Sequence, residues 1–93
     1  GVDDVKVKNS FSFSIYPNPV KATAVAQIVL NKKSNIELRL MDMQGKLIRE
    51  KRYYLMEGVS TVNIPVNHLT AGTYILEAII KNGERRSLKI LVL

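Results

Sequence analysis

Residues 73–93, TYILEAIIKNGERRSLKILVL, decide the fold of this chain. Their first part is rich in β-branched and aliphatic side chains that alternate between two faces, which is typical of a β-strand. Asn82-Gly83 follows, and this pair between two alternating runs is the strongest short-range signal for a hairpin with a type I′ turn. The second run, Arg85 to Leu93, alternates again. The sequence therefore predicts an antiparallel hairpin in this region.

The side chains expected to face the core lie at alternate positions of both strands. They are Tyr74, Leu76, Ala78 and Ile80 in the first strand, and Leu88, Ile90 and Val92 in the second. Burial of the three aliphatic side chains of the second strand contributes about 5–9 kcal/mol, at ~1.5–3 kcal/mol each. A domain of this size has a total stability of only about 5–14 kcal/mol. We therefore expect the last strand to be part of the core, and its removal to unfold the domain.

Five further segments with strand character precede this hairpin at intervals of roughly ten residues. They are residues 11–15, 22–30, 36–40, 46–55 and 59–64. The second of these is apolar on both faces, as in a central strand. The fourth carries four consecutive charges, as in an edge strand that resists aggregation. Seven short strands without a long helix predict an all-β fold, an immunoglobulin-like antiparallel β-sandwich of about seven strands.

Three turn signals separate these segments. Residues 16–19, YPNP, end the first strand, because each proline lacks an N–H and restricts the residue before it to extended geometry. Asn18 between the two prolines either terminates the strand or is presented on the surface. Residues 42–45, DMQG, fit a type I turn closed by a glycine in the left-handed region. Gly72, directly before a strand, is expected to allow a backbone turn that a side chain would strain.

Composition argues against catalytic and metal chemistry. The 93 residues correspond to one small domain with no cysteine and with His68 as the only histidine. These counts exclude a disulfide framework and a thiolate metal site, and no nucleotide-binding or hydrolase motif occurs. Asp3-Asp4 is a carboxylate pair in a segment expected to be solvated. No apolar run approaches the ~18–20 residues of a transmembrane helix. We expect a domain that is not an enzyme, with no catalytic residue, metal or cofactor.

Two binding functions stay open on the residues alone. The formal charge of +6 attracts anionic partners such as nucleic acid, although the basic residues are dispersed, and we expect no nucleic-acid partner. A nucleic-acid binder would lose affinity steeply with salt. Tyr53, Tyr54 and Tyr74 could together form a stacking face for sugars. That arrangement would make the chain a carbohydrate-binding or adhesive β-sandwich module.

Four segments taken in order resemble the C-terminal sorting domain of the type IX (Por) secretion system, type A. They are residues 15–19 (IYPNP), 40–47 (LMDMQGKL), 69–74 (LTAGTY) and 89–92 (KILV), and the likeness covers residues 11–93. The signal-motif residues that this resemblance implies are Tyr16, Pro17, Asn18, Pro19, Asp42, Gly45, Gly72, Tyr74, Lys89, Ile90, Leu91 and Val92.

The resemblance implies a non-catalytic export signal at the end of a longer protein. Residues 11–93 would be the sorting domain, and residues 1–10 a linker from a covalently attached N-terminal cargo domain. The domain would be recognised in the periplasm and would direct its cargo through an outer-membrane type IX translocon to the cell surface or beyond. A sortase-like signal peptidase would then cleave in or before residues 1–10. Weak self-association through edge strands is a further expected interaction.

Overall fold

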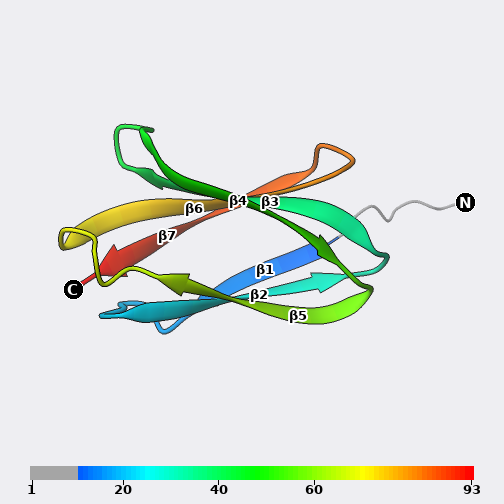
Figure 1. Cartoon of the computed structure of the whole chain (residues 1–93), viewed down its shortest axis with the longest axis horizontal. Coiled ribbons are helices and arrows are strands. Elements are labelled where there is room, and N and C mark those ends of the chain that lie inside the picture. The colour runs from blue at the N-terminus through cyan, green and yellow to red at the C-terminus, as the bar shows by residue number, and fades with distance from the viewer. Residues whose placement is uncertain (1–10) are drawn as a thin grey trace, which may run out of the picture.

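Two antiparallel sheets packed face to face make up the fold of residues 11–93, the part of the chain that the computed structural model describes (Figure 1). The strands are β1 (Phe11–Tyr16), β2 (Thr23–Leu30), β3 (Ser34–Asp42), β4 (Leu47–Leu55), β5 (Gly58–Pro65), β6 (Gly72–Ile80) and β7 (Arg85–Val92). One sheet has the order β1-β2-β5 and the other the order β4-β3-β6-β7. The predicted seven-stranded immunoglobulin-like sandwich is confirmed. The expected linker, residues 1–10 with Asp3-Asp4, lies outside the described residues.

The core lies between the two sheets and is filled by the alternate side chains that face inward. Its buried members are Phe11, Val20, Ala24, Ala26, Ile28, Leu30, Ile36, Leu38, Leu40, Val62, Ile64, Val66, Tyr74, Leu76, Ala78, Ile80, Ile90 and Val92. The predicted inward face of residues 74–80 is confirmed at every position, and Ile90 and Val92 of β7 are buried as expected. Leu88 on the same face is half-buried. The last strand is therefore a core strand.

The hairpin between β6 and β7 forms as predicted, but the prediction of a type I′ turn within it is wrong. A type I′ turn needs a positive φ at both central residues, whereas among the described residues only glycines, here Gly83 at +94°, have one. The Gly83 N–H donates to the Ile80 carbonyl at 2.9 Å, and the Ile80 N–H donates to the Glu84 carbonyl at 3.0 Å. The loop therefore has three residues, 81–83, and only its last is left-handed.

The register of the strands explains this longer loop. Tyr74 of β6 lies opposite Ile90 of β7, and Leu76 lies opposite Leu88, so that core positions pair with core positions. A two-residue loop would shift β7 by one residue against β6. Because side chains alternate with a period of two, that shift would turn the whole apolar face of β7 to solvent. Burial of β7 therefore selects the three-residue loop.

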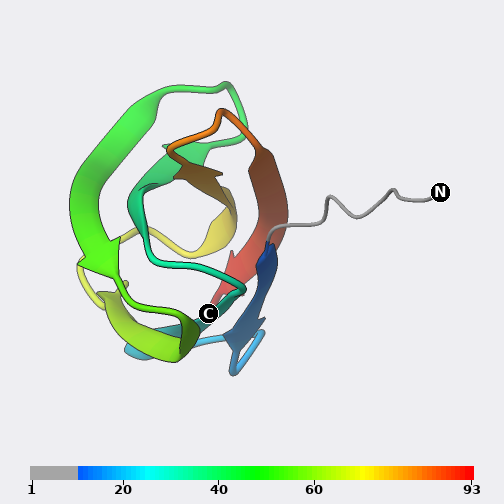
Figure 2. The same ribbon diagram turned by 90° about the vertical axis from the view of Figure 1, so that its right-hand side faces the viewer.

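The two long sides of the sandwich differ. On one side β1 and β7 lie side by side, which Figure 2 shows, and an isolated bridge joins Val20 to Val92. On the other side, β4 and β5 are the edge strands of the two sheets and are not paired with each other. The prediction of a charged edge strand is confirmed for β4, and that of a central strand is confirmed for β2. The sandwich is therefore closed along β1–β7 and open along β4–β5.

Candidate recognition site

Segments that are far apart in the sequence meet at one end of the sandwich. Asp42 at the end of β3 pairs with Tyr74 of β6, and Tyr74 pairs with Ile90 of β7. Asn18, from the loop between β1 and β2, lies on the far side of β7. These four residues form a line across the molecule that we call the motif row. It lies at the end where the C-terminus is marked in Figure 1.

The side chain of Asn18 acts as a substitute for a neighbouring strand on β7. Its Nδ2 donates to the Lys89 carbonyl at 2.9 Å, and its Oδ1 accepts the Leu91 N–H at 2.9 Å. Val20 continues the pairing: its N–H donates to the Leu91 carbonyl at 2.8 Å, and its carbonyl accepts the Leu93 N–H at 2.9 Å. The loop thereby pairs with backbone groups of the last part of β7 and of Leu93.

The flanking prolines are compatible with this role because neither has an N–H to satisfy. Both peptide bonds that precede them, Tyr16-Pro17 and Asn18-Pro19, are cis. Asn18 is exposed, as are the two prolines beside it. Asn18 therefore lies at the surface, which is one of the two alternatives given for it. Its amide, however, is used to hold the edge of β7. Sequence reasoning missed this role, since the bonds join residues that are 71 and 73 positions apart.

Tyr74 and Gly72 build the start of β6 next to β7. The Tyr74 side chain is buried, and its hydroxyl donates to the Thr70 carbonyl at 2.5 Å. Gly72 has a φ of +151°, which side chains rarely adopt, and it lies opposite Val92. The structure thus confirms Tyr74 as a core side chain and Gly72 as a position that needs glycine. Together they fix the loop against the end of β7.

Asp42 and Gly45 build the hairpin at the other end of the motif row. Oδ1 of Asp42 accepts the N–H groups of Gln44 and Lys46, both at 2.9 Å. Gly45 has a φ of +85°, and its N–H donates to the Asp42 carbonyl at 3.0 Å. The predicted type I turn with a left-handed glycine is confirmed.

The predicted motif residues therefore divide into a buried group and an exposed group, with Asp42 and Gly72 half-buried between them. Tyr74, Ile90 and Val92 are buried and belong to the scaffold. The exposed group consists of Tyr16, Pro17, Asn18, Pro19, Gly45, Lys89 and Leu91. Tyr16 and Leu91 are the large apolar side chains of the exposed group, at 46% and 41% exposure.

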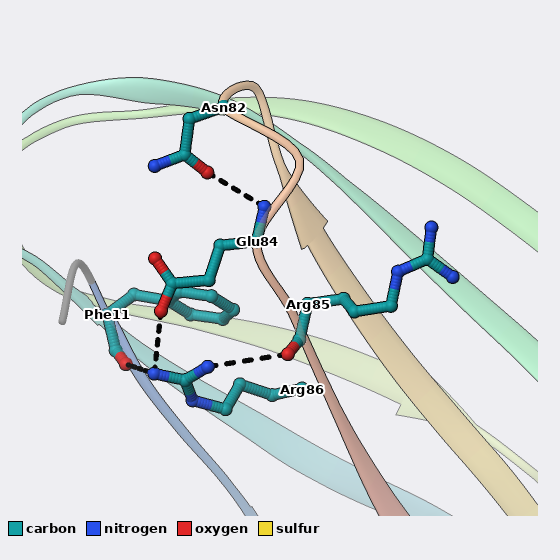
Figure 3. Close-up of polar contacts among 5 residues, drawn as sticks. All are labelled: Phe11, Asn82, Glu84, Arg85 and Arg86. Carbon is teal, nitrogen blue, oxygen red and sulfur yellow. Dashed lines mark hydrogen bonds and ion pairs between the residues drawn. The ribbon is translucent and has the colours of Figure 1, made fainter. Parts of the chain in front are cut away.

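A cluster around Arg86 holds the opposite end of the molecule, where the chain reaches β1 (Figure 3). The Arg86 guanidinium lies 4.9 Å from the ring centroid of Phe11, and its Nη2 donates to the Phe11 carbonyl at 3.3 Å. The same nitrogen lies 2.7 Å from Oε2 of Glu84. The Glu84 N–H in turn donates to Oδ1 of Asn82 at 2.8 Å. Sequence analysis did not predict the contact between Arg86 and Phe11, because the two residues are 75 positions apart.

A hollow of about 230 Å³ lies on the open side of the sandwich, between β4 and β5. Its apolar lining comes from Leu38, Leu40, Ile64 and Leu76, and its cationic lining from Arg49 and Lys51. We call this space, with these six residues, the β4–β5 hollow. Arg49 and Lys51 pair with the inward-facing positions Leu40 and Leu38 of β3, so they share the inward face. The sequence signal for this site was the run of four charged residues at positions 49–52, which puts two cations on the inward face of β4.

Tyr53 also lines the space of the β4–β5 hollow. Burial raises the pKa of its hydroxyl above the usual 10.0, and the positive charge of Arg49 opposes part of that rise in pKa. The Lys51 ammonium lies 5.7 Å from the centroid of the Tyr53 ring. Burial thus favours the neutral hydroxyl of Tyr53, although the ring lies next to two cations.

The expected tyrosine face for sugars does not form. Tyr74 is buried in the core, Tyr53 faces the β4–β5 hollow, and Tyr54 is 54% exposed on the other face of β4. Because Tyr74 is buried and Tyr53 and Tyr54 lie on opposite faces of β4, the three rings share no exposed surface, and the structure contradicts this basis for a carbohydrate-binding module. His68 is exposed. Across residues 11–93, no group of three or more histidine, cysteine or acidic side chains could hold a metal ion. The same residues contain no helix that is long and apolar enough to cross a membrane.

The family model of the secretion system C-terminal sorting domain matches residues 14–93. The chain belongs to this family. It is thus a sorting signal of the type IX secretion system. Domains of this family are in general non-catalytic. The signal implies transit to the cell surface or the extracellular space. A search of curated protein sequences found no match.

Among solved structures, the fold is similar to that of dimeric latent PorU from Porphyromonas gingivalis. The TM-score is 0.77 at 16% sequence identity, and the match covers 99% of this chain. It covers 10% of the PorU chain, so the sorting domain corresponds to a small part of that protein. At this identity the similarity supports the sandwich fold.

Proposed function

We propose that this sorting domain directs a covalently attached upstream cargo across the outer membrane through the type IX translocon, and that the end carrying the motif row is the surface that the translocon reads. The observation that carries the proposal is the convergence of the four motifs. Segments separated by up to 73 positions lie in one line because Asn18 binds β7 and β7 pairs with β6. The exposed side chains of Lys89 and Leu91 stand along that line.

The direction of β1 supports this assignment. β1 begins at Phe11, in the cluster around Arg86, and runs toward the motif row. A strand of eight residues, such as β7, is about 27 Å long at ~3.4 Å per residue. Cargo that precedes Phe11 would therefore leave the sandwich at the end away from the motif row. A receptor could bind that row while the cargo stays attached.

The remaining steps of the proposal concern the route and the cleavage. The domain passes through the periplasm, and a sortase-like signal peptidase cleaves at the cell surface, in or before residues 1–10. Cleavage at that place would leave residues 11–93 intact. The domain is then a substrate of the peptidase and performs no catalysis itself.

A fusion experiment tests the proposal. Residues 1–93 are fused to a periplasmic reporter in a cell with a functional type IX system, and the extracellular fraction of the reporter is measured. We expect export of the fusion and a loss of export when Lys89→Glu or Leu91→Ser changes an exposed side chain next to Ile90 of the motif row. Lys32→Glu is the matched control, since Lys32 is exposed in the turn between β2 and β3, away from the row.

The folded state of each variant is checked by thermal denaturation of the purified domain. A reporter that stays in the periplasm would contradict the sorting role. Normal export of both folded variants would refute the motif row as the surface that is read.

A further inference from the structure

We propose that the open side of the sandwich binds an extended peptide segment of another protein, which pairs with β5 and places an acidic side chain beside Arg49 and Lys51 in the β4–β5 hollow. This inference goes beyond the sorting function and does not depend on it.

The first observation is the unequal protection of the strand edges. The edge of β7 is covered by Asn18 and Val20, and β1 lies against β7. β4 carries four consecutive charged residues and an irregular register with β3 after Leu40, two features that discourage strand addition. β5, with the sequence GVSTVNIP, has no charged residue and one proline, at its last position. β5 is therefore the edge best suited to accept another strand.

The second observation is the space beside that edge. The sheet that contains β5 has three strands, whereas the sheet across from it has four. The β4–β5 hollow of about 230 Å³ lies where the inward side chains of an added strand would project. In strand addition, backbone hydrogen bonds supply affinity, and pockets for alternate side chains supply specificity. Leu38, Leu40 and Ile64 give this pocket an apolar floor.

The third observation is charge. Arg49 and Lys51 line the β4–β5 hollow, and no acidic side chain lines it. Nη2 of Arg49 donates to the Pro65 carbonyl across the opening at 3.5 Å, which is a long hydrogen bond. The guanidinium has five N–H donors, so most of them remain available. Both cations therefore have N–H donors available for a carboxylate. Together with the apolar floor, they favour a peptide whose inward-facing side chains are in turn apolar, acidic and apolar.

A designed peptide tests the inference directly. The probe is acetyl-Thr-Val-Thr-Glu-Thr-Val-Thr-amide, with matched peptides that carry Gln or Lys in place of Glu. Each is titrated into the ¹⁵N-labelled 93-residue chain, and amide chemical shifts are followed by NMR. We expect the Glu peptide to shift β5 amides and those near Arg49 and Lys51. The Gln peptide should bind about tenfold more weakly, because it loses the charge-assisted contact.

A charge exchange provides the strictest control. Lys51→Glu should weaken binding of the Glu peptide and strengthen binding of the Lys peptide. Arg52→Glu, one residue along β4 and on the opposite face, should change neither. The inference is wrong if no peptide shifts β5, if the shifted amides lie along β1 and β7 instead, or if the Lys51→Glu variant keeps the original preference while it remains folded.

Discussion

Removal of the Asn18 amide should loosen the end of β7 and leave the rest of the sandwich folded. Asn18→Ala deletes two hydrogen bonds of 2.9 Å to the backbone of β7. A typical intramolecular hydrogen bond contributes about 0.5–1.5 kcal/mol. Because water can reach the freed groups at this exposed site, we place the total cost near the lower half of the sum, at about 1–2 kcal/mol. For a domain of 60–100 residues, that cost lowers Tm by roughly 4–16 °C.

Hydrogen exchange locates the effect. The Leu91 N–H donates to Asn18 and should exchange faster in Asn18→Ala, whereas the amides in the centre of β6 should keep their relative protection. Asn18→Asp keeps an acceptor for the Leu91 N–H but places an oxygen next to the Lys89 carbonyl, so it should be destabilising despite its similar size. Asn31→Ala, in an exposed turn, is the matched control. Unchanged Leu91 exchange together with an unchanged Tm in Asn18→Ala would refute the reasoning.

Three further predictions concern single side chains. Tyr74→Phe removes the bond from the Tyr74 hydroxyl to the Thr70 carbonyl and should lower the free energy of unfolding by about 0.5–1.5 kcal/mol in urea denaturation; an unchanged midpoint would contradict a role for this bond. Gly45→Ala forces a side chain into a backbone with a φ of +85° and should cost about 1–2 kcal/mol by the same measurement, while equal stability would show that the turn can relax. Tyr53 has a raised pKa in the folded state because burial favours its neutral form. Its contribution to stability should therefore be complete below the unfolded pKa and be lost as the pH rises through the folded pKa. Absorbance titration of tyrosinate should show the pKa rise further in Arg49→Gln, and a fall in the pKa would contradict the assigned cause.

The strands were predictable because each carries a local signal, which for most of them is an alternating pattern. The core face of β6 is a local property of residues 74–80, and the structure buries all of its predicted members. The turn after β6 was not predicted correctly, although the sequence held the information. Tyr74 and Ile90 are both even-numbered core positions, and two such positions can lie opposite each other only across a loop with an odd number of residues. Register therefore overrides the local preference of Asn82-Gly83 for a two-residue turn.

The contacts that complete the site were not predictable from local patterns. The bonds of Asn18 to β7 and of Arg86 to Phe11 join residues 71 to 75 positions apart. No periodicity links such residues, because their approach depends on how the two sheets are stacked. The β4–β5 hollow is similar. The charges of β4 indicated an edge strand, but only the stacking of the sheets places Arg49 and Lys51 above an apolar floor.

The opposite placement of Phe11 and the motif row has a mechanical consequence. A pull on the chain before Phe11, against a receptor that holds Asn18 and β7, would act along the strands of the sandwich. Hydrogen bonds of an antiparallel ladder are perpendicular to the strands. Such a force runs along the backbone of β1 to Asn18, and it loads the bonds of Asn18 and Val20 to the C-terminal segment in shear, several at once, instead of opening them one after another. With cargo attached before Phe11 and a receptor on the motif row, as proposed above, the domain should stay folded under tension between the two.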